Sequence, residues 1–270
     1  MTDYGFCTWT LGDITLNKKL EIAASLGVTG VEIEGDLKQD PLQIKQQLKK
    51  YNLKPLSITP QDVDISSCNE ETRQAAVQYY LDLIDWTAKI GAPRFCIHGQ
   101  VGKISWDHYL DVHWDLLVKS VQEVTSKSSE KDLEVVYEVL NRYENYQVLT
   151  AATGLKLIQA VANSNLKLLL DAYHMNIEEN DPAAALISAA AQLGVYHIAD
   201  SNRQAIGDGH TNFSQQFKAL KEIHYQGPLI MEMTVAGPNP FTPMKGQDYL
   251  SVVTDYYQRS LQILHAVFGD

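Results

Sequence analysis

The feature that most restricts the fold of this chain is the regular alternation of two patterns along its 270 residues. Short runs of apolar, β-branched and aromatic residues are typical of buried strands, and each is followed by a longer segment with the periodicity of an amphipathic helix. Eight such pairs are predicted, with the strand first in each: Tyr4–Trp9 and Leu16–Leu26, Gly30–Glu34 and Pro41–Tyr51, Pro55–Thr59 and Glu70–Ile90, Arg94–His98 and Trp106–Ser126, Leu133–Glu138 and Tyr146–Asn163, Leu166–Asp171 and Pro182–Leu193, Tyr196–Ile198 and Phe213–Ile223, Pro228–Glu232 and Gln247–Phe268.

The residues at the segment ends support these boundaries. Gly27, Gly91 and Gly194 follow predicted helix ends, where a left-handed cap favours glycine. Asp40 and Asp181 each precede a proline, so a capping carboxylate stands before a proline of the first helical turn. No Ser/Gly-rich linker or low-complexity segment interrupts the alternation. We therefore expect one domain over residues 1–270.

The alternation also predicts the sheet. Strands that are separated by helices run parallel, because a parallel connection needs a crossover of that length. Eight units in this length predict an α/β fold of the (β/α)8 TIM barrel type, which usually has about 250 residues. The rival is a doubly wound open sheet, but no glycine-rich phosphate turn follows Trp9 or any later strand.

Charge and cysteine content exclude several partners. The formal net charge is -11, whereas nucleic acids and anionic membranes bind basic patches. Neither a secretory leader nor an apolar run of about 18 residues is visible. Cys7, Cys68 and Cys96 lie far apart without metal-binding spacing, which is typical of a reducing compartment. We expect a cytoplasmic protein that binds neither nucleic acid nor membrane.

Ionisable side chains terminate the last four predicted strands: Glu138, Asp171, His197 and Glu232. The carboxyl ends of the strands carry the active site in a TIM barrel. Three carboxylates at the rim of a dry interior could not all stay ionised without a cation. This oxygen-rich donor set suits one divalent metal ion, either Mn²⁺, Mg²⁺ or Co²⁺, and also accommodates Zn²⁺. The alternative, simple pairing of glutamates with basic residues at the mouth, explains single positions rather than four consecutive strands.

Four motifs then carry a resemblance to a known family. They are YEVLNRYE over residues 137–144, LDAYHMNIEE over 170–179, HIADSNR over 197–203 and Met231-Glu232. In this order and spacing they resemble the ketose 3-epimerase group (D-tagatose, D-psicose and L-ribulose 3-epimerases) of the xylose-isomerase-like barrel superfamily. The resemblance covers the C-terminal half of the chain, and the N-terminal half is compatible in layout with weaker motifs.

The resemblance implies roles for individual residues. It implies four metal ligands: Glu138, Asp171, His197 and Glu232. Two of these, Glu138 and Glu232, would also form the acid/base pair on opposite faces of the substrate carbon. It implies three substrate-binding residues: Glu144, His174 and Arg203. Each of these three also has a purely structural interpretation, as a charge near a helix start for Glu144 and as solvated loop positions for His174 and Arg203. Asn141 and Arg142 are equally explained as loop scaffold and are not included.

The expected function is C3 epimerisation of a free ketose, with one divalent metal ion, above all Mn²⁺, as cofactor. The resemblance also implies a homodimer or homotetramer. Hydroxypyruvate isomerase and inosose dehydratase have similar ligands and stay open as alternatives. An endonuclease IV-like phosphodiesterase would need more strand-end histidines and a basic groove, whereas this chain has 8 histidines and a net charge of -11. A non-catalytic sugar-binding barrel would not need both glutamates.

Side chains at the ends of three further strands have two interpretations each. Trp9 is either a wall against the apolar face of a sugar or part of the core. Glu32 and Glu34 alternate with Val31 and Ile33, so one of these pairs points into the barrel and the other away, and the pattern does not say which. His98 either contacts substrate or is a hydrogen-bonded core histidine.

Overall fold

The structure is a computed structural model that describes residues 2–104, 110–237 and 246–269. Its strands are β1 (Tyr4–Cys7), β2 (Gly30–Glu34), β3 (Lys54–Thr59), β4 (Arg94–Ile97), β5 (Glu134–Glu138), β6 (Leu166–Asp171), β7 (Leu193–Ile198) and β8 (Leu229–Met231). Its α-helices are α1 (Leu16–Leu26), α2 (Pro41–Lys50), α3 (Glu70–Ile90), α4 (Leu110–Ser129), α5 (Ala151–Val161), α6 (Ala172–Glu178), α7 (Pro182–Ala189), α8 (Phe213–Glu222) and α9 (Tyr249–Phe268). Two 3-10 turns, Thr8–Leu11 and Ala190–Gln192, complete the described elements.

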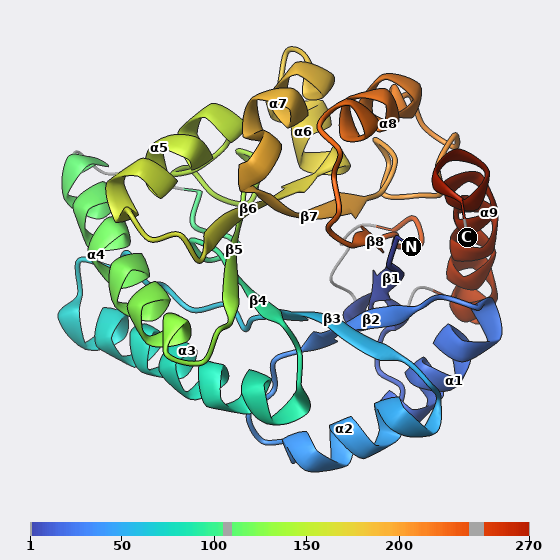
Figure 1. The fold of residues 1–270 in the computed structure, drawn as a ribbon, viewed down its shortest axis with the longest axis horizontal. Coiled ribbons are helices and arrows are strands. Elements are labelled where there is room, and N and C mark those ends of the chain that lie inside the picture. Colours follow the sequence, from blue (N-terminus) through green and yellow to red (C-terminus); the bar gives the residue numbers. More distant parts are fainter. Residues whose placement is uncertain (1, 105–109, 238–245, 270) are drawn as a thin grey trace.

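The strands form one parallel sheet that curls into a barrel, with the helices around its outside (Figure 1). Their hydrogen-bonded order is β3-β2-β1-β8-β7-β6-β5-β4. No ladder joins β3 to β4 within the described ranges, but the Nη1 atom of Arg94 on β4 donates to the carbonyl of Leu56 on β3 at 3.1 Å. The predicted (β/α)8 fold is confirmed.

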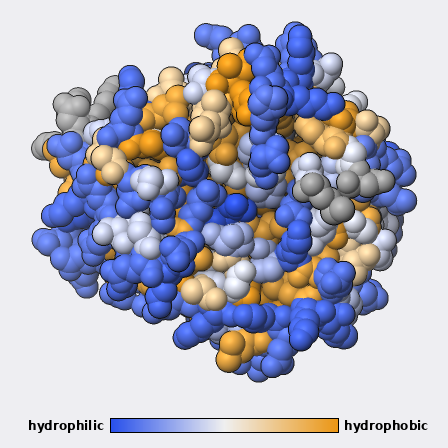
Figure 2. Space-filling model, in the orientation of Figure 1, coloured by the Kyte–Doolittle hydropathy of each residue, from blue (hydrophilic) through white to orange (hydrophobic). Residues whose placement is uncertain are grey.

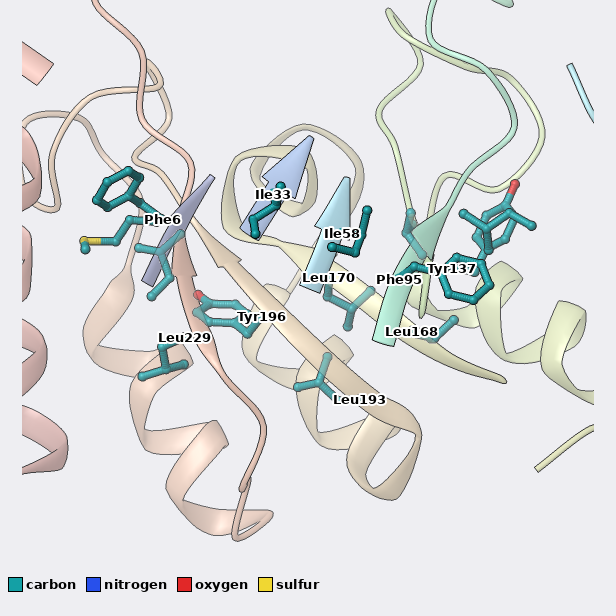
Figure 3. Close-up of a cluster of buried hydrophobic side chains, with 14 of the residues drawn as sticks. Phe6, Ile33, Ile58, Phe95, Tyr137, Leu168, Leu170, Leu193, Tyr196 and Leu229 are labelled. Carbon is teal, nitrogen blue, oxygen red and sulfur yellow. The ribbon is translucent and has the colours of Figure 1, made fainter. Parts of the chain in front are cut away.

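Successive strand residues point to opposite faces, so the barrel wall separates two apolar layers. The outer layer packs between strands and helices, and Figure 3 shows part of it, including Phe6, Phe95, Tyr137 and Tyr196. A separate cluster consists of Cys7, Leu56, Cys96, Val136, Leu169, Val195 and Ile230. These residues alternate with those of the outer layer on the same strands, which places them inside the barrel. Four of them stand two positions before the predicted metal ligands: Val136, Leu169, Val195 and Ile230. The ligand side chains therefore share the interior face.

Most of the predicted caps are confirmed. Gly27 and Gly91 end α1 and α3 with φ of 77° and 89°, and the side chains of Asp40 and Asp181 accept backbone N–H bonds at the starts of α2 and α7. The prediction for Gly194 is wrong, because this residue lies within β7 and has no left-handed backbone. A Cβ atom there would lie 2.7 Å from Val136 Cγ1 on β5 and 2.9 Å from Lys167 Cβ on β6, so packing against these strands, and not a helix cap, requires glycine.

Some other boundaries also differ from the predictions. His174 lies in α6 rather than on a loop, because Asp171 caps a helix that begins directly after it. The helix expected from Tyr146 begins only at Ala151. Trp106, the expected start of another helix, lies outside the described residues, and α4 is described from Leu110.

The face of the molecule in view is largely hydrophilic. Hydrophilic side chains predominate over the face drawn in Figure 2, with apolar side chains visible between them. Of the helices in the described part of the chain, none combines the length and the apolar character that a membrane crossing needs.

Candidate metal centre at the barrel mouth

The four ionisable strand-end residues come together at one end of the barrel. Glu138 ends β5, Asp171 ends β6, His197 lies on β7 and Glu232 follows β8 directly. Each offers one ligand atom, and these atoms lie within 4.8 Å of one another. All four side chains are buried. The group is therefore compact enough to surround a single ion, as the sequence predicts.

The imidazole of His197 supplies the clearest test of whether a cation fits. Its Nδ1 atom is buried and has no hydrogen-bond partner. The same atom lies 3.6 Å from Glu232 Oε2 and 3.9 Å from Glu138 Oε1. A buried nitrogen without a partner is costly, and this one faces carboxylates on the side where a ligand atom is needed. With three carboxylates and one imidazole, the donor set fits one divalent cation.

Arg203 brings a positive charge to the same carboxylates. Its Nη1 atom lies 3.1 Å from Asp171 Oδ2 and 2.5 Å from Glu232 Oε2. The guanidinium is buried and also stacks over the Tyr173 ring, at 4.2 Å from the centroid. Asp200 shapes the loop that carries Arg203, because its carboxylate accepts three backbone N–H bonds, from Ser201, Gly207 and Thr211. The loop is thus built to hold the arginine inward.

The two glutamates of the cluster have pKa values that are shifted in opposite directions. Burial and the neighbouring Glu232 charge raise the pKa of Glu138 well above its usual value. Burial would raise the pKa of Glu232 too, but Arg203 and His197 lower it well below the usual value. In the metal-free protein the two carboxyls therefore differ in their tendency to hold a proton.

We expect the affinity for a divalent cation to fall as the pH decreases through about 6. Ligand carboxyls must lose their protons to bind a metal, and burial, with the charge of Glu232, raises the pKa of Asp171 to about 6 despite Arg203. A raised pKa means that the protonated form stabilises the metal-free fold at low pH and that this contribution is lost as the pH rises. Calorimetric titration with Mn²⁺ on either side of pH 6 measures the effect. Equal affinities at both would contradict it.

Beside the cluster, Asn141 links two polar side chains, those of His174 and Glu144. Its amide nitrogen lies 2.7 Å from His174 Nδ1 and 2.9 Å from Glu144 Oε1, and its carbonyl oxygen accepts the N–H of Tyr143, which fixes the orientation of the amide. The His174 Nδ1 atom is therefore an acceptor, and its Nε2 carries the proton. Burial lowers the pKa of His174 well below its usual value, so the ring is a neutral donor. Its Nε2 lies 3.6 Å from Asp171 Oδ2.

A cavity of about 360 Å³ opens beside these residues, a volume that suits a small ligand. Its lining includes Glu138, Glu144, His174, Arg203 and Glu232 together with Trp9, Glu34, Asp36, Asp62 and His98. Trp9 lines the cavity, and its indole nitrogen also donates to Glu232 Oε1 of the four-residue cluster at 3.0 Å. The direction of β2 is also resolved: Glu32 is buried inside the barrel, and Glu34, two residues further along the same face, lies at the cavity and pairs with Lys19.

All the site residues predicted from the sequence thus lie at one barrel end: Glu138, Glu144, Asp171, His174, His197, Arg203 and Glu232. Two residues were missed. Asn141 was set aside as loop scaffold, although its place inside the YEVLNRYE motif, between Glu138 and Glu144, was a signal. Glu32 could not be assigned a direction from its pattern.

Fold and site together define a class of protein, a TIM barrel with a carboxylate–imidazole cluster at the carboxyl ends of its strands. The chain belongs to the xylose isomerase-like TIM barrel family, whose model matches residues 20–251. D-psicose 3-epimerase from Ruminiclostridium cellulolyticum is 32% identical over 188 residues, which cover 68% of this chain and 61% of that protein. L-ribulose 3-epimerase from Methylomonas sp. is 39% identical over 115 residues, 43% of this chain and 40% of that protein.

The chain therefore spans less than two thirds of the length of these two relatives. Over a longer range, it is similar to a solved structure of D-allulose 3-epimerase from Methylomonas sp. in complex with D-allulose. The TM-score is 0.87 at 27% sequence identity, and the match covers 99% of this chain and 97% of that one. The resemblance to ketose 3-epimerases that the four motifs indicate is confirmed.

Proposed function

We propose that this chain, acting as one domain, is a divalent-metal-dependent ketose 3-epimerase. The observation that carries the proposal is the pair Glu138 and Glu232, two buried carboxyls that line one cavity and belong to the four-residue group that could hold a cation. The relatives named as ketose 3-epimerases support the same activity. A barrel that only bound sugar would have no need of two such carboxyls.

The proposed reaction moves one proton at C3 of the ketose. One glutamate removes the C3 proton, the C–H electron pair forms the C2–C3 double bond, and the π pair of the C2 carbonyl moves onto its oxygen, which gives an enediolate; the carbonyl re-forms when C3 is protonated again. The other glutamate delivers a proton to the opposite face of C3, which inverts that carbon. His174, a neutral donor, and Arg203 hold substrate oxygens, while Glu144 and Asn141 keep His174 in place. A cation held by Glu138, Asp171, His197 and Glu232 would supply Lewis-acid stabilisation of the developing negative charge.

We also propose that the sugar is not phosphorylated. Three acidic side chains, Glu34, Asp36 and Asp62, line the cavity beyond the cluster. Among the described residues that line it, Arg203 is the sole cationic side chain of Lys or Arg type, and it already contacts two carboxylates. A phosphate group is doubly charged and favours basic partners. Hydroxyl groups, in contrast, can donate hydrogen bonds to carboxylates.

Finer points belong to the same proposal. The oxygen-rich donor set favours Mn²⁺ over softer metals. A homodimer or homotetramer in the cytoplasm is proposed from the resemblance to the epimerase group and from the free state of all three cysteines. Light scattering of the purified chain measures its assembly.

The proposal is tested with a panel of free and phosphorylated ketoses in deuterated water. With Mn²⁺ present, we expect a free ketose to take up deuterium at C3 while its C3 epimer forms, as NMR follows both. An aldose product would indicate an isomerase of the hydroxypyruvate type, and loss of water from the substrate would indicate a dehydratase. Deuterium uptake by none of the sugars would contradict the proposed function.

A further inference from the structure

Glu32 is a buried carboxylate that the proposed reaction does not use. Its side chain is 1% exposed, and it stands in register with Cys7 of β1 and Ser57 of β3. Since Cys7 belongs to the apolar cluster inside the barrel, Glu32 also lies inside the barrel. A carboxylate there costs several kcal/mol unless its oxygens are paired. We therefore expect both of its oxygens to have specific partners.

The two oxygens of Glu32 have different partners. Oε1 accepts the hydroxyl of Thr59 at 2.7 Å and the thiol of Cys7 at 3.6 Å. Oε2 lies 3.3 Å from Nε2 of His197. Because Oε1 is held by two donors, Oε2 is left for the imidazole. The carboxylate is thus fixed on one side and presented to the histidine on the other.

This contact determines which imidazole nitrogen is free. In a neutral imidazole, the ring nitrogen that faces a carboxylate carries the proton, and the other nitrogen offers its lone pair. For His197 that other nitrogen is Nδ1, which has no hydrogen-bond partner and points to Glu138 and Glu232. Carboxylates in this position are known to orient metal-binding histidines and to raise their basicity. Glu32 itself lies outside the four-residue group that could hold an ion.

We infer that Glu32 is a positioning residue of the metal centre: through Oε2 it holds the proton of His197 on Nε2 and turns Nδ1 toward the cation. The inference rests on the proposed function, since it presumes a cation on the four strand-end residues. It adds a residue of β2 to a centre whose ligands all lie on or beside β5 to β8.

The first experiment is a calorimetric titration of metal-free full-length protein with Mn²⁺. For Glu32→Leu, which removes both oxygens in an apolar setting, we expect affinity to fall about 10–100-fold. Glu32→Gln retains one acceptor oxygen and should recover part of the loss, and it keeps the test available if the leucine variant does not fold. Near-UV circular dichroism establishes that each variant is folded.

The matched controls are Glu34→Leu and Glu34→Gln. They remove the same charge from the same strand, but Glu34 contacts Lys19 and Thr8 rather than His197. We expect both to bind Mn²⁺ as the unchanged protein does. If they lose as much affinity as the Glu32 variants, the effect is one of net charge and the inference is wrong. It is also wrong if folded Glu32→Leu retains full affinity.

The second readout is the tautomer of His197. In ¹⁵N-histidine-labelled protein with Mg²⁺, we expect the proton on Nε2, with His197→Gln used to assign the signal. In Glu32→Leu the signal should shift toward a mixture of the two tautomers, whereas in Glu34→Leu it should not change. A proton on Nδ1 in the unchanged protein would overturn the inference.

The two proposals fail in different ways. If the unchanged protein neither binds Mn²⁺ nor exchanges C3 protons, the proposed function fails. If it does both and folded Glu32→Leu binds Mn²⁺ equally well, the role of Glu32 alone fails.

Discussion

Glu232→Gln should lower the rate of C3 proton exchange by about 10²–10⁴-fold while the barrel remains folded. The amide has the size of the carboxyl and can still accept the indole N–H of Trp9, which lies 3.0 Å from Oε1. It cannot accept a proton from carbon, however, and it is a weaker partner for Arg203. Deuterium uptake at C3, followed by NMR at saturating Mn²⁺, measures the loss.

A matched control separates catalysis from general damage. Glu134→Gln changes the same residue type at the amino end of β5, where Glu134 pairs with Arg94 at 2.7 Å. We expect this variant to exchange protons at the normal rate, because that end of a TIM barrel contributes to stability rather than to chemistry. Metal content is measured in both variants. Normal exchange by metal-loaded Glu232→Gln would remove Glu232 from the acid/base pair.

Arg203→Met should destabilise the metal-free protein by about 3–5 kcal/mol at neutral pH, because it leaves buried carboxylates without their cation. Arg203 contacts both Asp171 and Glu232, and its side chain is 7% exposed. Methionine fills much of the same volume, so the loss of charge dominates. Denaturant unfolding in the presence of a chelator measures the change in free energy.

Two conditions should reduce this loss. Below pH 6 the carboxyl of Asp171 can take up a proton, since burial and the charge of Glu232 raise its pKa to about 6. Saturating Mn²⁺ should also restore stability, by about 2.7 kcal/mol at a hundredfold excess over the dissociation constant. If neither low pH nor saturating Mn²⁺ restored stability, the interpretation of the carboxylates as a metal centre would be contradicted.

The control for this variant is Arg259→Met. Arg259 makes a two-pronged contact with Asp208, as short as 2.7 Å, but its side chain is 40% exposed. Surface ion pairs contribute about 0–1 kcal/mol. We therefore expect a small change that Mn²⁺ does not affect.

Much of the candidate site could be predicted because strand ends obey simple geometry. Glu138, Asp171 and Glu232 each end an apolar run, and parallel strands of a barrel bring such ends together. The helix-cap signals at Gly27 and Asp40 act locally and were interpreted correctly. Local helix-capping preferences, and the meeting of parallel strand ends at one end of a barrel, account for these correct predictions.

Other features could not be predicted because they depend on contacts between distant strands. The glycine at position 194 has a cap-like place in the sequence, yet it is required by the side chain of Val136 on β5, which is separated from β7 by β6. Asn141 acquires its importance only when α6 brings His174 within 2.7 Å of its amide.

The sequence by itself determined the eight strand–helix units, the barrel and the side chains at its last four strand ends. Only the tertiary structure decided how those side chains are held. The alternation in β2 allows Glu32 and Glu34 to point either into the barrel or away from it. The register of Cys7 with Glu32, together with the shift in strand pairing between Val31 and Glu32, selects the inward direction. The physical reason is that alternation defines two faces of a strand, whereas pairing with a distant strand decides which face meets the interior.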